Sequence, residues 1–169
     1  MIIQLNAHNA EPYIEQLSEL LQDAVDGGAS VGFLAPLSLT EATEYWQTVM
    51  ASLGEGLALW VALEQERVVG AVQLSLCLKN NGLHRAEVQK LFVLRTQRGR
   101  GIAQKLMTQL EAFALRHERT LLVLDTEAGS AAESLYQRLG WLRVGEIPNY
   151  VKSPAGALRA TALYYKLLQ

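Results

Sequence analysis

The sequence has few of the features that mark secreted, membrane-bound or disordered proteins. It holds one cysteine, Cys77, so no disulfide can form within the chain. No apolar run approaches the roughly 20 residues that a membrane-spanning helix needs. The first residues lack the basic start and long apolar stretch of a secretory signal. Since half of the 169 residues are hydrophobic, we expect a folded cytoplasmic protein that is not attached to a membrane.

The chain also lacks an excess of charge of either sign. Fifteen basic and seventeen acidic residues leave a formal net charge of -2 at pH 7. Such a balance provides no overall field to attract nucleic acid or an anionic membrane surface, so any anion binding must be local. The three histidines, His8, His84 and His117, show no metal-ligand spacing, and we therefore predict no metal site and no nucleic-acid partner.

Hydrophobic periodicity and turn residues predict one α/β domain over residues 1–169. Expected strands cover residues 1–5, 57–63, 67–78, 86–94, 120–125, 141–147 and 161–168, and expected helices cover 11–25, 40–53, 102–114 and 131–139. Thr40 is the predicted N-cap of the second helix, and Pro148 is assigned to a loop. Three consecutive strands joined by short turns favour an antiparallel meander, and the strand-helix-strand order that follows implies a parallel crossover. We expect a mixed, mostly antiparallel twisted sheet of six to seven strands flanked by four helices.

The stretch "RTQRGRGIAQKL", residues 95–106, lies between a strand-like run and a helix. A helix start leaves backbone N–H groups unpaired and carries a partial positive charge, so a glycine-rich turn into a helix can bind an anion. Arg98 and Arg100 add charge that suits a pyrophosphate. The alternative is a solvated basic turn that only caps a surface helix. The stretch matches neither the phosphate loop of nucleotide triphosphatases nor the dinucleotide fingerprint.

The same stretch resembles the acetyl-CoA motif of the GNAT superfamily of N-acetyltransferases. That motif runs Arg or Gln, two residues, Gly, one residue, then Gly or Ala, and Arg98, Gly101 and Ala103 stand at these positions. The preceding "KLFVL" is similar to the family's pantetheine-binding strand. "AAESLYQRLGW" is similar to its following helix, with Tyr136 where the family commonly has a tyrosine. The resemblance implies an enzyme that transfers an acetyl group from acetyl-CoA to an amine.

The resemblance also implies which residues hold the cofactor. Backbone groups of the strand would bind the pantetheine arm, and the loop would cradle the pyrophosphate through its N–H groups. Gly129 stands where the family often has an asparagine, so a side-chain contact to the cofactor is either missing or supplied by Ser130. The cofactor-binding residues that follow are Leu91, Phe92, Val93, Arg98, Gly99, Arg100, Gly101, Ile102, Ala103, Gln104, Ser130 and Tyr136.

Acetyl transfer needs a neutral amine and a proton for the departing thiolate. Asp125 ends the second of the parallel strands, at the edge where α/β sheets place ligands, and is one candidate for the base. The resemblance assigns Glu87 as the carboxylate that removes the amine proton, directly or through water. It assigns Tyr136 as the proton donor. Each residue has a structural alternative. Glu87 could be a solvated strand end or an ion-pair partner of Arg85, Asp125 could cap the helix that follows, and Tyr136 could be a core aromatic.

The acceptor is less well defined by the sequence. Segments "DGGASVGF", "VQLSLC", "RAEVQKL", "LDTEAGS" and "RVGEIP" resemble a branch of the family that inactivates a toxin of the β-lactam amino-acid type, which implies a small-molecule amine as acceptor. The pocket would involve "GGASVGF", Trp46 and Tyr150. A carboxylate on the acceptor would need a cation, and Arg85, Lys90 and Lys152 are the candidates.

Two other functions stay open at this point. The chain could acetylate a protein or peptide, or it could bind acyl-CoA as a sensor without catalysis. We expect a monomer or a homodimer.

Overall fold

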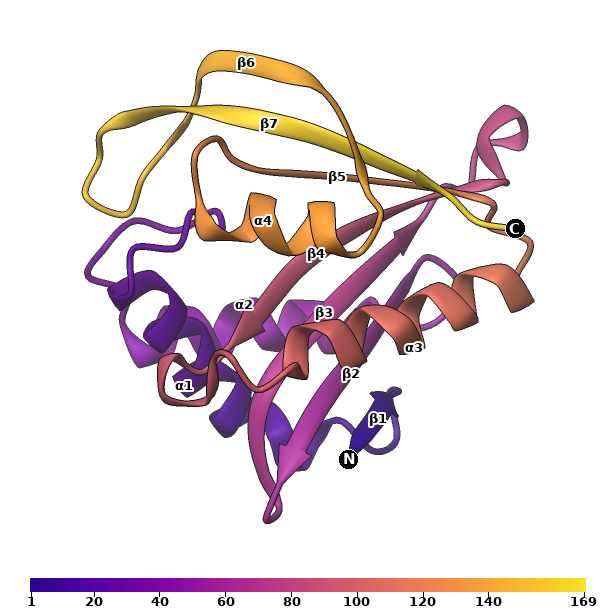
Figure 1. Ribbon diagram of the computed structural model, residues 1–169. Coiled ribbons are helices and arrows are strands. Elements are labelled where there is room, and N and C mark those ends of the chain that lie inside the picture. The colour runs from indigo at the N-terminus through magenta and orange to yellow at the C-terminus, as the bar shows by residue number, and fades with distance from the viewer.

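The computed structural model describes residues 1–169 as a seven-stranded sheet with helices on both faces (Figure 1). The strands are β1 (Ile2–Leu5), β2 (Leu57–Glu64), β3 (Arg67–Leu76), β4 (Arg85–Val93), β5 (Leu121–Glu127), β6 (Leu142–Lys152) and β7 (Leu158–Leu167). The α-helices are α1 (Ile14–Asp26), α2 (Leu39–Ala51), α3 (Ile102–Arg116) and α4 (Ala131–Arg138). Their order in the sheet is β1-β2-β3-β4-β5-β7-β6, and only β4 and β5 are parallel. The predicted mixed, mostly antiparallel architecture is confirmed.

Strands β2 and β3 are buried on both faces, because helices cover each side of this half of the sheet (Figure 1). Leu59 and Val61 of β2 pack into the core formed with α1 and α2. Ala58 and Trp60 face the other way, into the core formed with α3 and α4. Burial on both faces explains the continuous apolar run of β2, which shows no alternation of polar residues.

The parallel pair β4 and β5 is short, and this opens the sheet. Pairing covers only Arg85–Glu87 of β4 and Leu121–Val123 of β5. Beyond these residues β5 continues beside β7, with which it pairs through Glu127, while β4 continues beside β3. The backbone edges of β4 and β5 that face each other are therefore unpaired for the rest of their length.

Strand β5 is buried on one face only. Leu122 and Leu124 lie in the core with α4 and are at most 3% exposed. Leu121 and Val123 on the opposite face are only half-buried. The reason is that α1 and α2 cover the face over β1 to β4 and do not extend over β5 (Figure 1).

The N-cap of α2 is Ser38 and not Thr40. The Ser38 hydroxyl accepts a hydrogen bond from the Glu41 N–H at 3.2 Å, and the Glu41 carboxylate accepts one from the Ser38 N–H at 3.1 Å. This reciprocal capping box satisfies two backbone donors and fixes the start of the helix two residues earlier than predicted.

The loop predicted around Pro148 is instead part of strand β6. The register of β6 against β7 shifts between Ile147 and Val151, and Asn149 takes a left-handed φ of 56°. Proline lacks the N–H that a central strand would need, but β6 lies at the edge of the sheet and has a partner on one side only. An interrupted edge strand therefore accommodates Pro148.

Candidate active site

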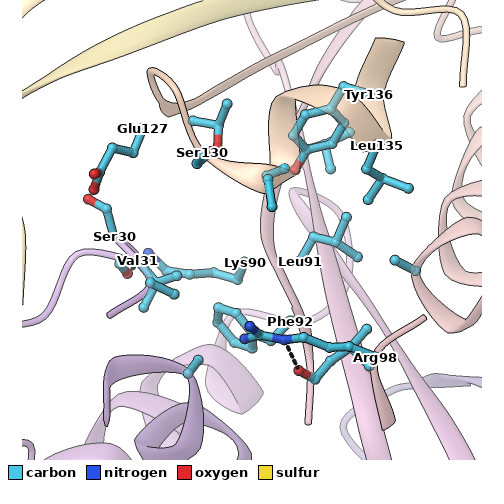
Figure 2. A pocket seen from close by; sticks show the side chains of 18 of the residues that line it. Ser30, Val31, Lys90, Leu91, Phe92, Arg98, Glu127, Ser130, Leu135 and Tyr136 are labelled. Carbon is cyan, nitrogen blue, oxygen red and sulfur yellow. Dashed lines mark hydrogen bonds between the residues drawn. The ribbon is translucent and has the colours of Figure 1, made fainter. Parts of the chain in front are cut away.

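A cleft of ≈ 1170 Å³ opens where β4 and β5 diverge. The loop after α1, strand β4, the start of α3, strand β5 and helix α4 all contribute to its walls (Figure 2). Of the residues proposed from the sequence for catalysis and cofactor binding, those that line the cleft are Glu87, Leu91, Phe92, Val93, Arg98, Gly99, Gly101, Ile102, Ala103, Gln104, Asp125, Ser130 and Tyr136. Segments far apart in the chain thus meet in one place.

Arg100 is the proposed site residue that does not line the cleft. Its guanidinium forms a bidentate ion pair with the carboxylate of Glu64 on β2, at 2.7 and 2.9 Å, and also contacts the side-chain oxygen of Gln97. Only its backbone remains available in the loop. Arg98, by contrast, borders the cleft, and its Nε donates a hydrogen bond to the Val93 carbonyl at 3.3 Å (Figure 2).

The N-terminus of α3 is open to a ligand. Its N-cap is Gly101, with φ 75° and ψ 9°, and no side chain caps the first turn. A Cβ built on Gly99 or Gly101 would meet no heavy atom within 4 Å. The backbone N–H groups of the first turn therefore face free space at the positive end of a helix dipole. This is the arrangement that binds phosphate groups through the backbone.

The segment of β4 that borders the cleft directs its side chains to both cores. Leu91 packs against the core of α3 and α4, and the buried Phe92 meets Trp46 of α2 at 6.4 Å between ring centroids. At Leu91 and Phe92, β4 therefore presents its unpaired backbone edge to the cleft, as the predicted contact with a pantetheine arm requires. Trp46, proposed for the acceptor pocket, is fully buried and does not line the cleft, so that proposal is wrong.

Tyr136 lies on α4 and is 6% exposed. Its ring packs between Trp141 and Tyr164, each 6.0 Å away between centroids, and its hydroxyl points into the cleft (Figure 2). Burial raises the pKa of Tyr136 well above the usual range, and the negative charge of Asp125 raises it further. The phenol therefore stays protonated near neutral pH and is available as a proton donor.

Glu87 and Asp125 stand on the two diverging strands, and both border the cleft. Asp125 accepts a hydrogen bond from the Thr161 hydroxyl of β7 at 2.8 Å. It is not the cap of α4, whose N-cap is Ser130. Arg85 forms no ion pair with Glu87, and its guanidinium lies 3.7 Å from the sulfur of Cys77. The structure thus shows neither the ion pair nor the cap that the sequence left open as alternatives.

Sequence reasoning missed part of the site. Glu127 lines the cleft two residues after Asp125, and only the length of the apolar run before it could have indicated that β5 extends so far. Glu133 was also missed. Its carboxylate accepts hydrogen bonds from the Gly129 N–H at 2.7 Å and from the hydroxyl of Tyr164, and so it fixes the start of α4.

Lys90 was one of three candidate cations, and it is the one of the three that borders the cleft. Its side chain runs from β4 toward the loop after α1, where Nζ donates a hydrogen bond to the Val31 carbonyl at 2.7 Å (Figure 2). Burial lowers the pKa of Lys90, and the charges of Asp125 and Glu87 oppose that effect. Tyr150, suggested for the acceptor pocket, lies on β6 and is 57% exposed outside the cleft.

The structure contains no helix with the length and apolar character needed to cross a bilayer. No three His, Cys, Asp or Glu side chains are grouped so that they could hold a metal ion.

Comparison with known proteins places this fold and cleft in a family. Residues 16–141 match the model described as the acetyltransferase (GNAT) family. The chain is 36% identical over 96 residues to N-acetylaspartate synthetase from Danio rerio, which covers 56% of this chain and 33% of that protein. It is 32% identical over 102 residues to N-alpha-acetyltransferase 30 from Schizosaccharomyces pombe, covering 59% and 67% respectively. A solved ribosomal-protein-alanine N-acetyltransferase from Brucella melitensis superposes with a TM-score of 0.80 at 20% identity and covers 99% of both chains.

The chain therefore belongs to the acetyltransferase (GNAT) family. The predicted enzyme class, an acetyl-CoA-dependent N-acetyltransferase, agrees with this family and with a solved structural neighbour from Salmonella typhimurium that is described with its cofactor acetyl-CoA. The predicted fold is confirmed as well by the superposition over nearly the whole chain. The chain spans about a third of the length of the N-acetylaspartate synthetase that it matches.

Proposed function

We propose that this protein acetylates the amine of a small molecule of amino-acid type. The observation that carries the proposal is the placement of Glu87, Asp125 and Tyr136 in one cleft whose outer wall is the loop Gly27–Gly32. Lys90 ties this loop to β4 through the Val31 carbonyl. A cleft with a wall held in this way favours a small acceptor over a long extended chain.

The residues present fit acetyl-CoA, which supplies the acetyl thioester. Gly99 and Gly101 leave space for phosphate oxygens against the first-turn N–H groups of α3, and Arg98 adds a cation at the same place. The unpaired edge of β4 at Leu91 and Val93 can hydrogen-bond an amide-containing arm as a further strand would. An N–H group of the same edge can hold the thioester oxygen and stabilise the charge that develops there.

The two carboxylates of the cleft act on the acceptor amine. An amine attacks only when neutral, so a base must accept the proton that it carries or loses. Glu87 reaches the cleft from β4, and Asp125 reaches it from β5. Because Thr161 donates a hydrogen bond to Asp125, one of its oxygens is already occupied and its orientation is fixed. We assign Glu87 as the main base, with Asp125 holding the ammonium form of the acceptor or an intervening water.

Tyr136 acts on the leaving group. Its hydroxyl points into the cleft from α4 (Figure 2), and no protein atom accepts a hydrogen bond from it. Its raised pKa keeps the phenol protonated at neutral pH, so a proton is available to the sulfur as the thiolate departs. Ser130 at the N-cap of α4 lines the same wall and can contact the cofactor where Gly129 has no side chain.

The acceptor class is supported by the location of the resembling segments. "DGGASVGF", "RAEVQKL" and "LDTEAGS" are similar to the corresponding segments of tabtoxin resistance protein, an acetyltransferase that inactivates a β-lactam amino-acid toxin. In this structure they contribute the loop wall, Glu87 and Asp125. The name of N-acetylaspartate synthetase likewise points to an amino-acid product. We therefore propose amino acids and β-lactam amino acids as the acceptors to test first.

Peptide acetylation is the second candidate, because N-alpha-acetyltransferase 30 matches over 67% of its length. Acetyl-CoA consumption, followed with free amino acids, a β-lactam amino acid and short peptides, separates the two. We expect turnover with the small acceptors and little with peptides. Turnover with peptides alone would overturn the proposal. Tight acetyl-CoA binding without turnover on any amine would instead identify a sensor.

A further inference from the structure

Lys90 occupies a distorted position in β4. Ala71 of β3 pairs with Phe92 and Gln73 pairs with Gln89, so two residues of β4 stand opposite Val72 alone. Lys90 is one of these two and has a left-handed φ of 53°. A lysine in this conformation costs free energy and persists only where the surroundings impose it, which is a common finding at functional sites.

The bulge turns the Lys90 side chain toward the loop after α1. There its ammonium lies 5.9 Å from the ring centroids of both Phe33 and Tyr45, within the range of cation-π attraction. Its hydrogen bond to the Val31 carbonyl uses one of three N–H donors. Lys90 takes part in none of the ion pairs of the structure. A half-buried cation without a carboxylate partner is costly, and a bound anion would relieve that cost.

Lys90 also stands at the junction of two cavities. Together with Gln89 it borders both the cleft and a smaller pocket of ≈ 510 Å³. The smaller pocket carries polar groups, among them Tyr45, Gln73 and Ser75. An acceptor whose amine lies in the cleft can therefore place a polar side chain beyond Lys90.

The charges around Lys90 complement a zwitterion. Glu87 and Asp125, the two carboxylates assigned to the amine, are the groups whose charges act on Lys90. An α-amino acid carries its cationic amine and its carboxylate on one carbon atom, so the two groups need neighbouring sites of opposite charge. We propose that Lys90 binds the α-carboxylate of the acceptor while Glu87 and Asp125 face its amine. This assignment rests on the proposed function and adds the recognition of the carboxylate to it.

The other two candidate cations lack this placement. Arg85 contacts Cys77 and does not line either cavity. Lys152 is exposed at the end of β6 and lines neither cavity. Lys152 therefore serves as a matched control of the same residue type.

The test compares each of the common amino acids with its α-carboxamide as acceptor. For wild type, Lys90→Met and Lys152→Met, kcat/KM is measured for both members of the best pair. We expect Lys90→Met to lower the acid-to-amide ratio by about 10- to 100-fold, the range of one charge-assisted hydrogen bond. Lys152→Met should leave the ratio unchanged. Lys90→Arg, which retains the cation, should keep most of the preference.

The acid-to-amide ratio separates two effects of Lys90→Met: loss of the hydrogen bond to the Val31 carbonyl and loss of the carboxylate site. A merely structural role would lower kcat/KM for acid and amide together and leave their ratio at the wild-type value, and that result would overturn the assignment. An acid-to-amide ratio that falls as much in Lys152→Met as in Lys90→Met would also overturn the assignment. Circular dichroism and acetyl-CoA affinity show whether Lys90→Met folds. If it does not, the acid preference of Lys90→Arg is compared with that of wild type, and an unchanged preference supports the assignment. Equal use of acid and amide by wild type overturns it.

The failure of the proposed function has a different signature. In that case wild type acetylates only peptides or no amine at all, and the carboxylate assignment falls with it. Acetylation of acids and amides with equal efficiency by wild type leaves small-molecule acetylation standing and removes only the role of Lys90.

Discussion

Tyr136 combines a fixed position with a raised pKa. Its ring is held between Trp141 and Tyr164, and burial together with the charge of Asp125 keeps the phenol protonated. Tyr136→Phe preserves this packing and removes only the hydroxyl. We expect turnover to fall by roughly 10²-fold or more, the usual contribution of one acid-base group, while acetyl-CoA affinity changes little. Steady-state kinetics with an identified acceptor, paired with calorimetry, measures both. Wild-type rates at every pH would remove the acid role.

Glu87 is assigned to the opposite proton transfer, at the amine. Glu87→Gln should lower turnover, because no carboxylate on β4 then accepts the amine proton. Raising the pH should recover part of the rate relative to wild type, since a larger fraction of the acceptor amine is neutral before it binds. Tyr136→Phe should show no such recovery. The measurement is the pH dependence of turnover for both variants, and an unrescued Glu87→Gln would transfer the role of base to Asp125.

At the scale of elements, the uncapped start of α3 is the feature to which we assign cofactor binding. Gly101→Glu should abolish acetyl-CoA binding, because the new carboxylate occupies the space left for phosphate and repels it. The backbone at this position is left-handed, so the variant also loses about 1 kcal/mol of stability. Gly140→Glu is the matched control. Its φ is 79°, a Cβ there also meets nothing within 4 Å, and it does not line the cleft.

Calorimetry on the two glycine variants distinguishes strain from recognition. Both should lose similar stability, and only Gly101→Glu should lose acetyl-CoA affinity. Unchanged affinity in a folded Gly101→Glu protein would refute backbone recognition of the phosphates.

The capping box of α2 makes a second prediction at this scale. Ser38→Ala removes an N-cap whose hydroxyl accepts from the Glu41 N–H, and we expect the free energy of unfolding to fall by about 1 kcal/mol. Thr40→Ala lies within the first turn, makes no cap contact, and should change stability by less than about 0.5 kcal/mol. Denaturant unfolding of both variants measures the difference. An equal loss of unfolding free energy in the two variants would mean that Ser38 is no more important as a cap than Thr40.

At the scale of the whole molecule, the sequence predicted the order of elements and most of the cleft. Local periodicity identified every strand and α-helix, and the motif through Arg98, Gly101 and Ala103 identified a loop that lines the cleft. These features are local, because helix and strand periods and turn residues are set by neighbours in the chain. The pairing of β4 with β5 for only three residues is not local, since it joins Arg85–Glu87 to residues 36 positions further along the chain, as 121 − 85 shows.

The features that sequence reasoning missed depend on such long-range packing. The bulge at Lys90 becomes apparent only when β3 and β4 are paired, and the left-handed φ that it needs has no signature in a lysine. The ion pair of Arg100 with Glu64 joins residues 36 positions apart. Trp46 was assigned to the acceptor side by its position in the chain, but the face of α2 that it occupies is the buried one.

The irregular edge strand β6 has a consequence for the behaviour of the protein at high concentration. An unbroken edge of eleven residues would present a row of free donors and acceptors on which a second chain could align and begin to aggregate. Pro148 removes one donor from that row, and the register shift with the left-handed Asn149 twists the backbone out of line. Only short regular stretches remain on either side. The same interruption that misled the strand assignment therefore protects the protein against growth of the sheet from one molecule into the next.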